Sequence, residues 1–175
     1  MQRGLLLKSE SPQFLLYRLN PKNAYLFKIF ELFELMKKED FYTDNTMLAR
    51  RLLKYTQILR RLSDEDIRAI ILFGPAARGE WTEGSEVDIL TVTSTKVAPK
   101  KMSQIHEEAA HGVRHMLNIS SVSIAMDEVI QGFRKKRDFF PDLWRDRIVL
   151  YNEFLFWEMI RELTLITSGG NKGRK

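Results

Sequence analysis

Two acidic side chains stand two positions apart in a stretch whose residue types could bind a metal ion. Glu86 and Asp88 belong to a β-prone run that follows a glycine turn at Gly74. Successive side chains of a strand point to opposite faces, so Glu86 and Asp88 share one face. Mg²⁺ binds one or two carboxylates together with substrate phosphate oxygens. The pattern predicts a metal and triphosphate site with both carboxylates as metal ligands and catalytic groups. Solvated acidic pairs at strand ends are the ordinary alternative.

The turn in front of this pair has residues suited to phosphate. Its sequence over 74–80 is Gly-Pro-Ala-Ala-Arg-Gly-Glu. Gly74 lets the backbone approach a ligand closely, and a helix that begins near Pro75 would add N–H donors and the positive end of its dipole. The guanidinium of Arg78 could counter phosphate charge. We therefore expect the turn to contact the phosphates of a nucleotide.

Alternating strands and helices must position these residues. An unbroken apolar run over 69–73 predicts a buried strand, and 86–92 predicts a second one. An amphipathic helix is expected over 100–117 and a third strand over 119–125. The other expected elements are short helices at 127–135 and 141–146, a strand at 147–151 and a helix at 152–163. This order is typical of an α/β or α+β sheet.

The first 62 residues predict a hairpin and two helices. Two β-prone runs, 5–8 and 13–18, are separated by turn formers, and Asn20-Pro21 ends the second. The helix expected over 22–37 has an apolar stripe wide enough to require burial on two sides or a partner chain. A second helix follows the cap candidates at 43–45, and its outer face is basic, with Arg50, Arg51, Lys54, Arg60 and Arg61. Solvated charges are the ordinary explanation of that face, and phosphate contacts are the alternative.

Around the glycine turn the sequence resembles the DNA polymerase β-like nucleotidyltransferase superfamily, especially its minimal nucleotidyltransferases. The resemblance rests on Gly74-Pro75, on Ala77-Arg78-Gly79, and on Ser85 before Glu86-Val87-Asp88, with residues 76–85 between the first pair and the acidic motif. Upstream, the hairpin and helices resemble the region that joins a winged-helix DNA-binding domain to a minimal nucleotidyltransferase in archaeal-type regulators.

The resemblance implies an α/β (α+β) fold, a nucleotidyltransferase-like mixed sheet flanked by helices, with an N-terminal hairpin and helical arm. It also implies binding of a nucleoside triphosphate with Mg²⁺ and transfer of the nucleotidyl group to a hydroxyl acceptor. In that site the phosphates would lie among Gly74, Pro75, Arg78 and Ser85. Glu86 and Asp88 would hold the metal.

Three departures from the family pattern predict that transfer is weak or absent. Pro75 stands where the family has a serine, and it offers neither a hydroxyl nor an N–H. Glu86 replaces an aspartate and adds a methylene, which can displace a ligand of octahedral Mg²⁺. The family's third carboxylate matches Ser123, whose hydroxyl cannot accept a proton near neutral pH. Asp127 could substitute for it, but a helix N-cap is the more ordinary role.

Two other functions compete with nucleotidyl transfer. A catalytically impaired member of the family could serve as a regulatory or antitoxin-like module that binds a protein partner. A nucleic-acid-binding protein could use the wing-like hairpin and the basic helix instead. Mg²⁺-dependent nucleotide binding, transfer of a labelled nucleotidyl group and a salt-dependent shift with DNA would separate the three.

Several other residues have an ordinary explanation beside a functional one. His111 and His115 are spaced as zinc ligands, but Gly112 stands where a zincin has glutamate and no third ligand is evident. The basic run 134–137 could bind phosphate, although cations are favoured at a helix end. Trp81 is expected either to anchor a loop or to contact a base or ribose.

Composition narrows the class of protein. The chain has 175 residues, 44% hydrophobic residues and no cysteine, which indicates a folded protein without disulfides or a cysteine zinc site. The net charge is +6 over 1–62, −4 over 63–162 and +3 over 163–175. No apolar run approaches the ~20 residues of a bilayer-spanning helix, so we expect a cytoplasmic protein with no membrane contact. The expected division is an arm at 1–62, a nucleotidyltransferase-like domain at 63–168 and a disordered basic tail at 169–175.

Overall fold

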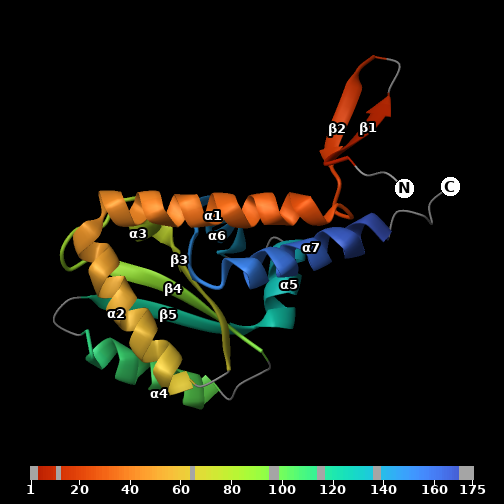
Figure 1. Cartoon of the computed structure of the whole chain (residues 1–175). Coiled ribbons are helices and arrows are strands. Elements are labelled where there is room, and N and C mark those ends of the chain that lie inside the picture. Colours follow the sequence, from red (N-terminus) through yellow and green to blue (C-terminus); the bar gives the residue numbers. More distant parts are fainter. Residues whose placement is uncertain are drawn as a thin grey trace.

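The computed structural model describes residues 4–10, 13–63, 66–94, 99–113, 117–135 and 139–169. Its centre is a four-stranded mixed sheet in the order β5-β4-β3-β6 (Figure 1). β4 and β5 are parallel, and β3 is antiparallel to both β4 and β6. The strands of this sheet are β3 (Ile67–Phe73), β4 (Glu86–Thr93), β5 (Asn118–Ala125) and β6 (Ile148–Tyr151). The expectation of a mixed sheet flanked by helices is confirmed.

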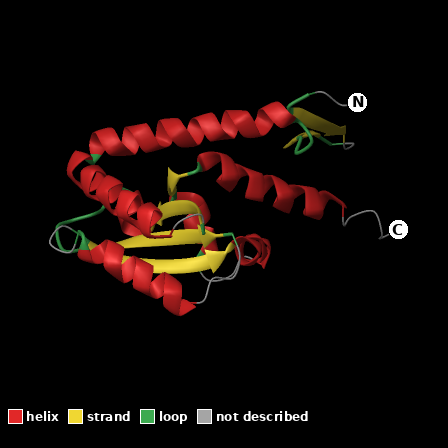
Figure 2. Ribbon diagram, turned by 60° about the horizontal axis from the view of Figure 1, so that its bottom comes forward, coloured by secondary structure: helices red, strands yellow, loops and turns green. Residues whose placement is uncertain are grey.

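Helices cover both faces of this sheet (Figure 2). The helices are α1 (Ala24–Asp44), α2 (Thr46–Ser63), α3 (Gly74–Ala77), α4 (Pro99–His111), α5 (Met126–Lys135), α6 (Phe140–Asp146) and α7 (Glu153–Gly169). α2 and α4 pack together on one face, and α5, α6 and α7 pack on the other. α1 packs along α7 and β6.

The alternation of apolar side chains along β3 explains why the sheet has two cores. Ile70 and Leu72 belong to the core under α2 and α4, whereas Ala69 and Ile71 belong to the core under α5, α6 and α7. All four are fully buried. This confirms the buried strand expected from the unbroken apolar run.

The expected hairpin and arm are also present. β1 (Leu6–Glu10) pairs antiparallel with β2 (Leu15–Leu19) as a separate two-stranded sheet that extends away from the body (Figure 1). α1 begins after Asn23, whose side chain accepts a hydrogen bond from the Tyr25 N–H at 2.9 Å. The helix continues past its expected end at residue 37 because Phe41 is buried and no Gly or Pro interrupts it before Asp44.

The arm is joined to the sheet by a buried ion pair. Arg147, directly before β6, donates from Nη2 to Oε2 of Glu34 on α1 at 3.0 Å. Lys37 donates to the carbonyl oxygen of Arg147 at 2.6 Å, and burial lowers the pKa of Lys37. These contacts hold α1 against the segment that leads into β6. The expected division of the chain into an arm at 1–62 and a domain at 63–168 stays a prediction.

Two more helices, besides α1, end at residues other than the expected ones. α4 ends at His111, because Gly112 follows it, although the sequence pattern predicted a helix to 117. α7 continues to Gly169, past the expected helix end at 163. The tail expected at 169–175 stays a prediction, since residues 170–175 lie outside the described part. Within the described residues, no helix combines the length and apolar character needed to cross a bilayer.

Candidate functional site

The glycine turn and one carboxylate of the acidic pair lie in direct contact. Gly74 follows the last residue of β3 and has a φ of +70°, in the left-handed region that favours glycine. Phe73 is paired with Asp88 across the β3 and β4 ladder. A Cβ atom at position 74 would lie 2.5 Å from Oδ2 of Asp88. Glycine is therefore required here both by the backbone angle and by the approach of the carboxylate.

Glu86 and Asp88 share the face of β4 that continues into the core under α5, α6 and α7. Leu90 lies in that core two residues further along, whereas Val87 and Ile89 lie in the opposite core. The prediction that the two carboxylates share a face is confirmed. Glu86 is exposed, Asp88 is half-buried, and no cation of the described residues pairs with either carboxylate. Their oxygens are free to bind a cation.

On β5, the residue beside Asp88 on this face is Ser120. The sequence analysis expected Ser123 at the position of the family's third carboxylate. The parallel register places Ser120 of β5 opposite Asp88 and Asn118 opposite Glu86. Ser123 is opposite Thr91 and faces α4, where its Oγ lies 2.8 Å from Nε2 of His106. The prediction that Ser123 takes the third carboxylate's position is wrong, because that residue has the opposite parity on the strand. Asp127 is the second residue of α5, so it lies in the first turn of the helix and is not the N-cap that the sequence favoured.

Ser123 belongs to a buried hydrogen-bonded chain that sequence reasoning did not find. The other ring nitrogen of His106, Nδ1, lies 2.7 Å from the hydroxyl of Tyr55 on α2. Burial lowers the pKa of His106 to about 4 and raises the pKa of Tyr55. The imidazole is therefore neutral near pH 7, with one nitrogen donating and the other accepting. A signal was present in the sequence, since position 106 falls within the apolar stripe of its helix beside Ile105.

Arg78 is engaged by two carboxylates. Its Nη1 donates to Asp146 at 2.7 Å, and its Nη2 and Nε donate to Glu80 at 2.7 and 3.0 Å. Asp146 is buried, and hydrogen bonds from Arg145 and then Arg78 lower its pKa to about 2. The hydrogen bonds to Glu80 and then to Asp146 raise the pKa of Arg78. Arg78 thus links the end of α3 to α6, so a role in countering phosphate charge would require it to leave these partners.

The loop between the turn and the acidic pair is held by local contacts. The Ser85 hydroxyl accepts from the Thr82 N–H at 3.3 Å and lies 2.6 Å from the Thr82 hydroxyl. Gly84, with a φ of +92°, completes this turn. Trp81 packs against the core under α2 and α4, and the Arg51 guanidinium lies 5.5 Å from its ring centroid. Trp81 is therefore a packed loop anchor, the ordinary one of its two expected roles.

The structure limits what the helix start and the histidines can contribute. α3 is a single turn of four residues, so it supplies little of the dipole expected at Pro75. His111 is exposed on α4, and His115 lies outside the described residues. Within the described part of the chain, no group of three His, Cys, Asp or Glu residues could hold a metal ion. A metal at Glu86 and Asp88 would need further oxygen ligands from its substrate or from water, as Mg²⁺ commonly does.

Comparison with known proteins finds a family match over the segment that contains these residues. Residues 53–116 match the family model described as "Nucleotidyltransferase domain", a segment that includes Gly74, Glu86 and Asp88. This confirms the resemblance to the nucleotidyltransferases. Among curated proteins no sequence gives a significant match. A solved structure described as "Crystal structure of the toxin-antitoxin with AMP-PNP" is similar at 13% identity and a TM-score of 0.46, over 66% of this chain and 85% of that one. A likeness at that level supports no statement about function.

Proposed function

We propose that the face carrying Glu86 and Asp88 binds a nucleoside triphosphate together with Mg²⁺, and that nucleotidyl transfer from it is weak or absent. The observation that carries this proposal is the contact of the Asp88 carboxylate with Gly74, beside a second carboxylate without a partner in the described residues. Both residues lie in the segment that matches the nucleotidyltransferase domain. Hard oxygen donors on one face fit Mg²⁺ and substrate phosphates.

Each residue has a definite part in this proposal. Glu86 and Asp88 would hold the metal, which when bound would neutralise phosphate charge and act as a Lewis acid. Gly74 has no side chain, which lets the Asp88 carboxylate lie against the turn, and Pro75 and Ser85 lie in the flanking turns. Arg78 holds the end of α3 against α6 through Asp146, and thereby positions the turn.

The weakness of transfer follows from the strand next to the pair. Ser120 and Asn118 stand opposite Asp88 and Glu86, so β5 supplies no carboxylate to this face. A serine hydroxyl cannot serve as a proton acceptor near neutral pH. The same observation favours the second candidate function, a nucleotide-binding regulatory module of the antitoxin-like kind that binds a protein partner.

Nucleic-acid binding through the hairpin has less support. The exposed side chains of the hairpin are mainly apolar, including Leu15, Leu16 and Tyr17, and Lys8 pairs with Glu10 at 2.7 Å. Phosphate contacts require cations along the surface. An apolar hairpin suits a protein surface better.

Two assays test the proposal together. Isothermal titration with a non-hydrolysable ATP analogue should give binding with Mg²⁺ and much weaker binding in chelator, and Asp88→Asn should remove the dependence on metal. Incubation with α-labelled ATP and hydroxyl acceptors should give little or no labelled product. Equal affinity with and without metal would contradict the metal site, and rapid labelling would contradict the impaired transfer.

A further inference from the structure

A large apolar surface on the hairpin and α1 is uncovered in the single chain. We call it the arm surface, and its members are Leu5, Leu6, Phe14, Leu15, Leu16, Tyr17, Leu19, Tyr25, Ile29, Leu32, Phe33, Leu35 and Met36. Elsewhere in the described residues, the exposed large apolar side chains are Met47, Leu53, Val122, Trp144 and Phe154, which are scattered over separate elements. Scattered apolar side chains are ordinary, whereas a contiguous set of this size marks an interaction site.

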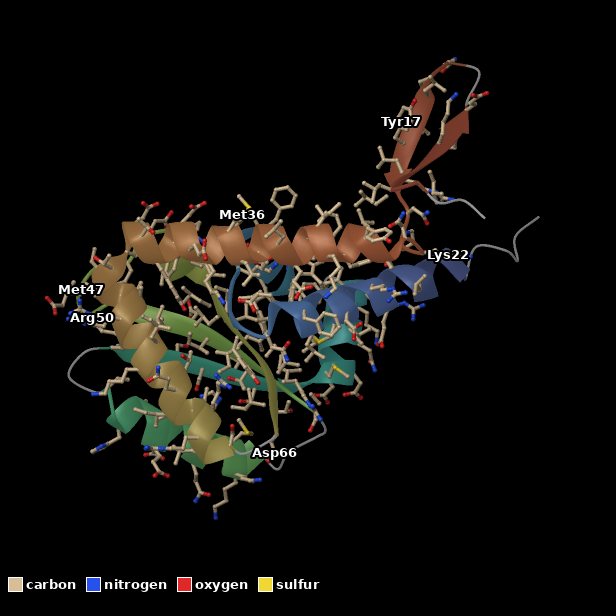
Figure 3. All side chains as sticks on the ribbon, in the orientation of Figure 1. Tyr17, Lys22, Met36, Met47, Arg50 and Asp66 are labelled. Carbon is tan, nitrogen blue, oxygen red and sulfur yellow. The ribbon has the colours of Figure 1, made fainter. Side chains whose placement is uncertain are left out.

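The arm surface is not the side of α1 that packs on the body. On the inner side Leu26 and Phe41 are buried, Phe30 stacks on Trp157 with ring centroids 4.7 Å apart, and Glu34 forms its ion pair with Arg147. Met36 points away from the sheet on the opposite side of the helix (Figure 3). The inner contacts fix α1 in place, so its outer stripe is presented in a defined geometry.

The outer stripe has the spacing of a helix pair. Tyr25, Ile29, Leu32 and Met36 follow one another at intervals of four, three and four residues, the a and d pattern of two packed helices. Because side chains alternate between the two faces of the hairpin, only the face with Leu6, Leu15, Tyr17 and Leu19 can join the six members on α1. Half-exposed side chains of this size contribute about 80–100 Å² each, so these members together offer about 800–1,000 Å² per chain. A standard interface buries about 800 Å² per partner, so the area suffices for a stable dimer.

The charges at the two ends of the stripe are complementary to each other. Lys22 is exposed just before α1, and Glu39 and Asp40 are exposed near its end. The lysines of the second half of α1 do not offset these acidic charges on the outer stripe. Lys37 contacts the Arg147 carbonyl oxygen and Lys38 pairs with Glu153. A parallel pair would bring like charges together at both ends. An antiparallel pair brings Lys22 beside Glu39 of the second copy, and it matches Tyr25 with Met36 and Ile29 with Leu32.

We propose that two copies of this chain pair through the arm surface, with their α1 helices antiparallel about a two-fold axis near the middle of the stripe. Such a pairing is isologous, because each copy offers the same patch. The hairpin rises from the start of α1 on the side of Met36 (Figure 3), so it reaches the end of the second copy's α1 and the start of its α2, where Met47 is exposed. A two-stranded hairpin is marginally stable alone, and this contact would cover it.

The mass of the protein and of matched variants tests the proposal. Sedimentation equilibrium should give twice the 20.6 kDa of one chain at micromolar concentration. Ile29→Glu should give a folded monomer, because the side chain is exposed in the single chain and a charge in the seam opposes association. Leu53→Glu changes an equally exposed apolar residue of α2 outside the arm surface, and it should leave the dimer intact. Circular dichroism checks that both variants are folded.

The direction of the pair has its own test. Because the protein contains no cysteine, introduced thiols report contacts without background. A mixture of Tyr25→Cys and Met36→Cys chains should form the mixed disulfide on mild oxidation. Two copies of Tyr25→Cys should not, since eleven residues of helix separate the positions by about 16 Å along the axis, and a disulfide requires Cα atoms within about 7 Å.

Charge reversal tests the proposed contact between Lys22 and Glu39 of the second copy. Lys22→Glu alone and Glu39→Lys alone should each weaken the dimer, and the double variant should recover it. A monomeric mass for the unmodified chain would overturn the proposal, whether the arm surface is covered by another segment or by a different protein. A dimer that survives Ile29→Glu would overturn the assigned surface, and a Tyr25→Cys homodisulfide would overturn the antiparallel direction.

Discussion

The Cα atom of Gly74 lies so close to the carboxylate of Asp88 that a Cβ atom there would come within 2.5 Å of Oδ2. The contact joins the turn after β3 to the acidic residue of β4 and defines the geometry of the candidate site. Gly74→Ala should therefore displace Asp88 as well as strain the backbone. Left-handed backbone costs a non-glycine residue about 1–2 kcal/mol, and the clash adds to that cost.

Gly79→Ala is the matched control for this substitution. Gly79 also has a positive φ, +79°, but a Cβ atom there would meet nothing within 4 Å. Urea unfolding should show a larger loss of stability for Gly74→Ala than for Gly79→Ala, and titration with the ATP analogue and Mg²⁺ should show a loss of affinity for Gly74→Ala alone. Equal effects of the two substitutions would contradict the role of the contact.

Adding a carboxylate opposite Asp88 should raise transfer. In a chain with Pro75→Ser and Glu86→Asp, Ser120→Asp places a third acid on the metal face, because Ser120 pairs with Asp88. Ser123→Asp places it on the α4 face against His106 instead. We expect Mg²⁺-dependent labelling from α-labelled ATP with the first triple variant and none with the second. The reverse result would show that the face assignment of β5 is wrong.

Stability should fall on mild acidification because of His106. Its pKa is about 4 in the folded protein and about 6.5 when unfolded, so between these values the unfolded chain binds a proton that the folded chain does not. The contribution is fully present above pH 6.5 and is lost as pH falls to 4, by about 3 kcal/mol in all. Urea midpoints measured across this range should decline.

His106→Gln provides the control for that slope. Glutamine can donate to and accept from Tyr55 and Ser123 but does not titrate. The variant should be less stable at neutral pH, because its shape differs, and its stability should vary less between pH 6.5 and 4. A slope identical to that of the unmodified protein would show that other groups cause it.

The buried ion pair between α1 and the strand β6 should respond unequally to single and double substitution. Glu34→Leu leaves Arg147 buried without a counter-charge and should cost about 3–5 kcal/mol. Arg147 also lies 4.5 Å from the Trp144 ring centroid, so an apolar residue fits its surroundings. Glu34→Leu with Arg147→Met should be clearly more stable than Glu34→Leu alone in urea unfolding. If the loss of stability in the double variant equals the sum of the losses in Glu34→Leu alone and Arg147→Met alone, this account is contradicted.

The parts of the site that follow from local periodicity could be predicted from the sequence. The spacing of Glu86 and Asp88 placed them on one face, and the apolar run before Gly74 predicted the buried strand that carries the turn. The parity of β5 could not be predicted in the same way. Serines stand at positions 120, 121 and 123, so both faces of this edge strand are polar and the pattern does not distinguish them.

Contacts between segments that are distant in the sequence could not be predicted either. Arg78 and Asp146 are 68 positions apart, and Tyr55 and His106 are 51 apart, so only the fold brings them together. Arg78 carried the expected charge for a phosphate ligand, but nothing in its neighbourhood along the chain pointed to a buried carboxylate on α6. Charge alone cannot distinguish a ligand-binding arginine from a structural one.

Diffraction from crystals soaked with a non-hydrolysable ATP analogue and Mn²⁺ in place of Mg²⁺ tests the central claim most directly. Mn²⁺ binds the same hard oxygen ligands and gives an anomalous signal that locates it. We expect an anomalous peak between the carboxylates of Glu86 and Asp88, with the phosphates of the analogue beside Gly74. Bound nucleotide elsewhere on the chain, or a peak that does not touch either carboxylate, would contradict the account.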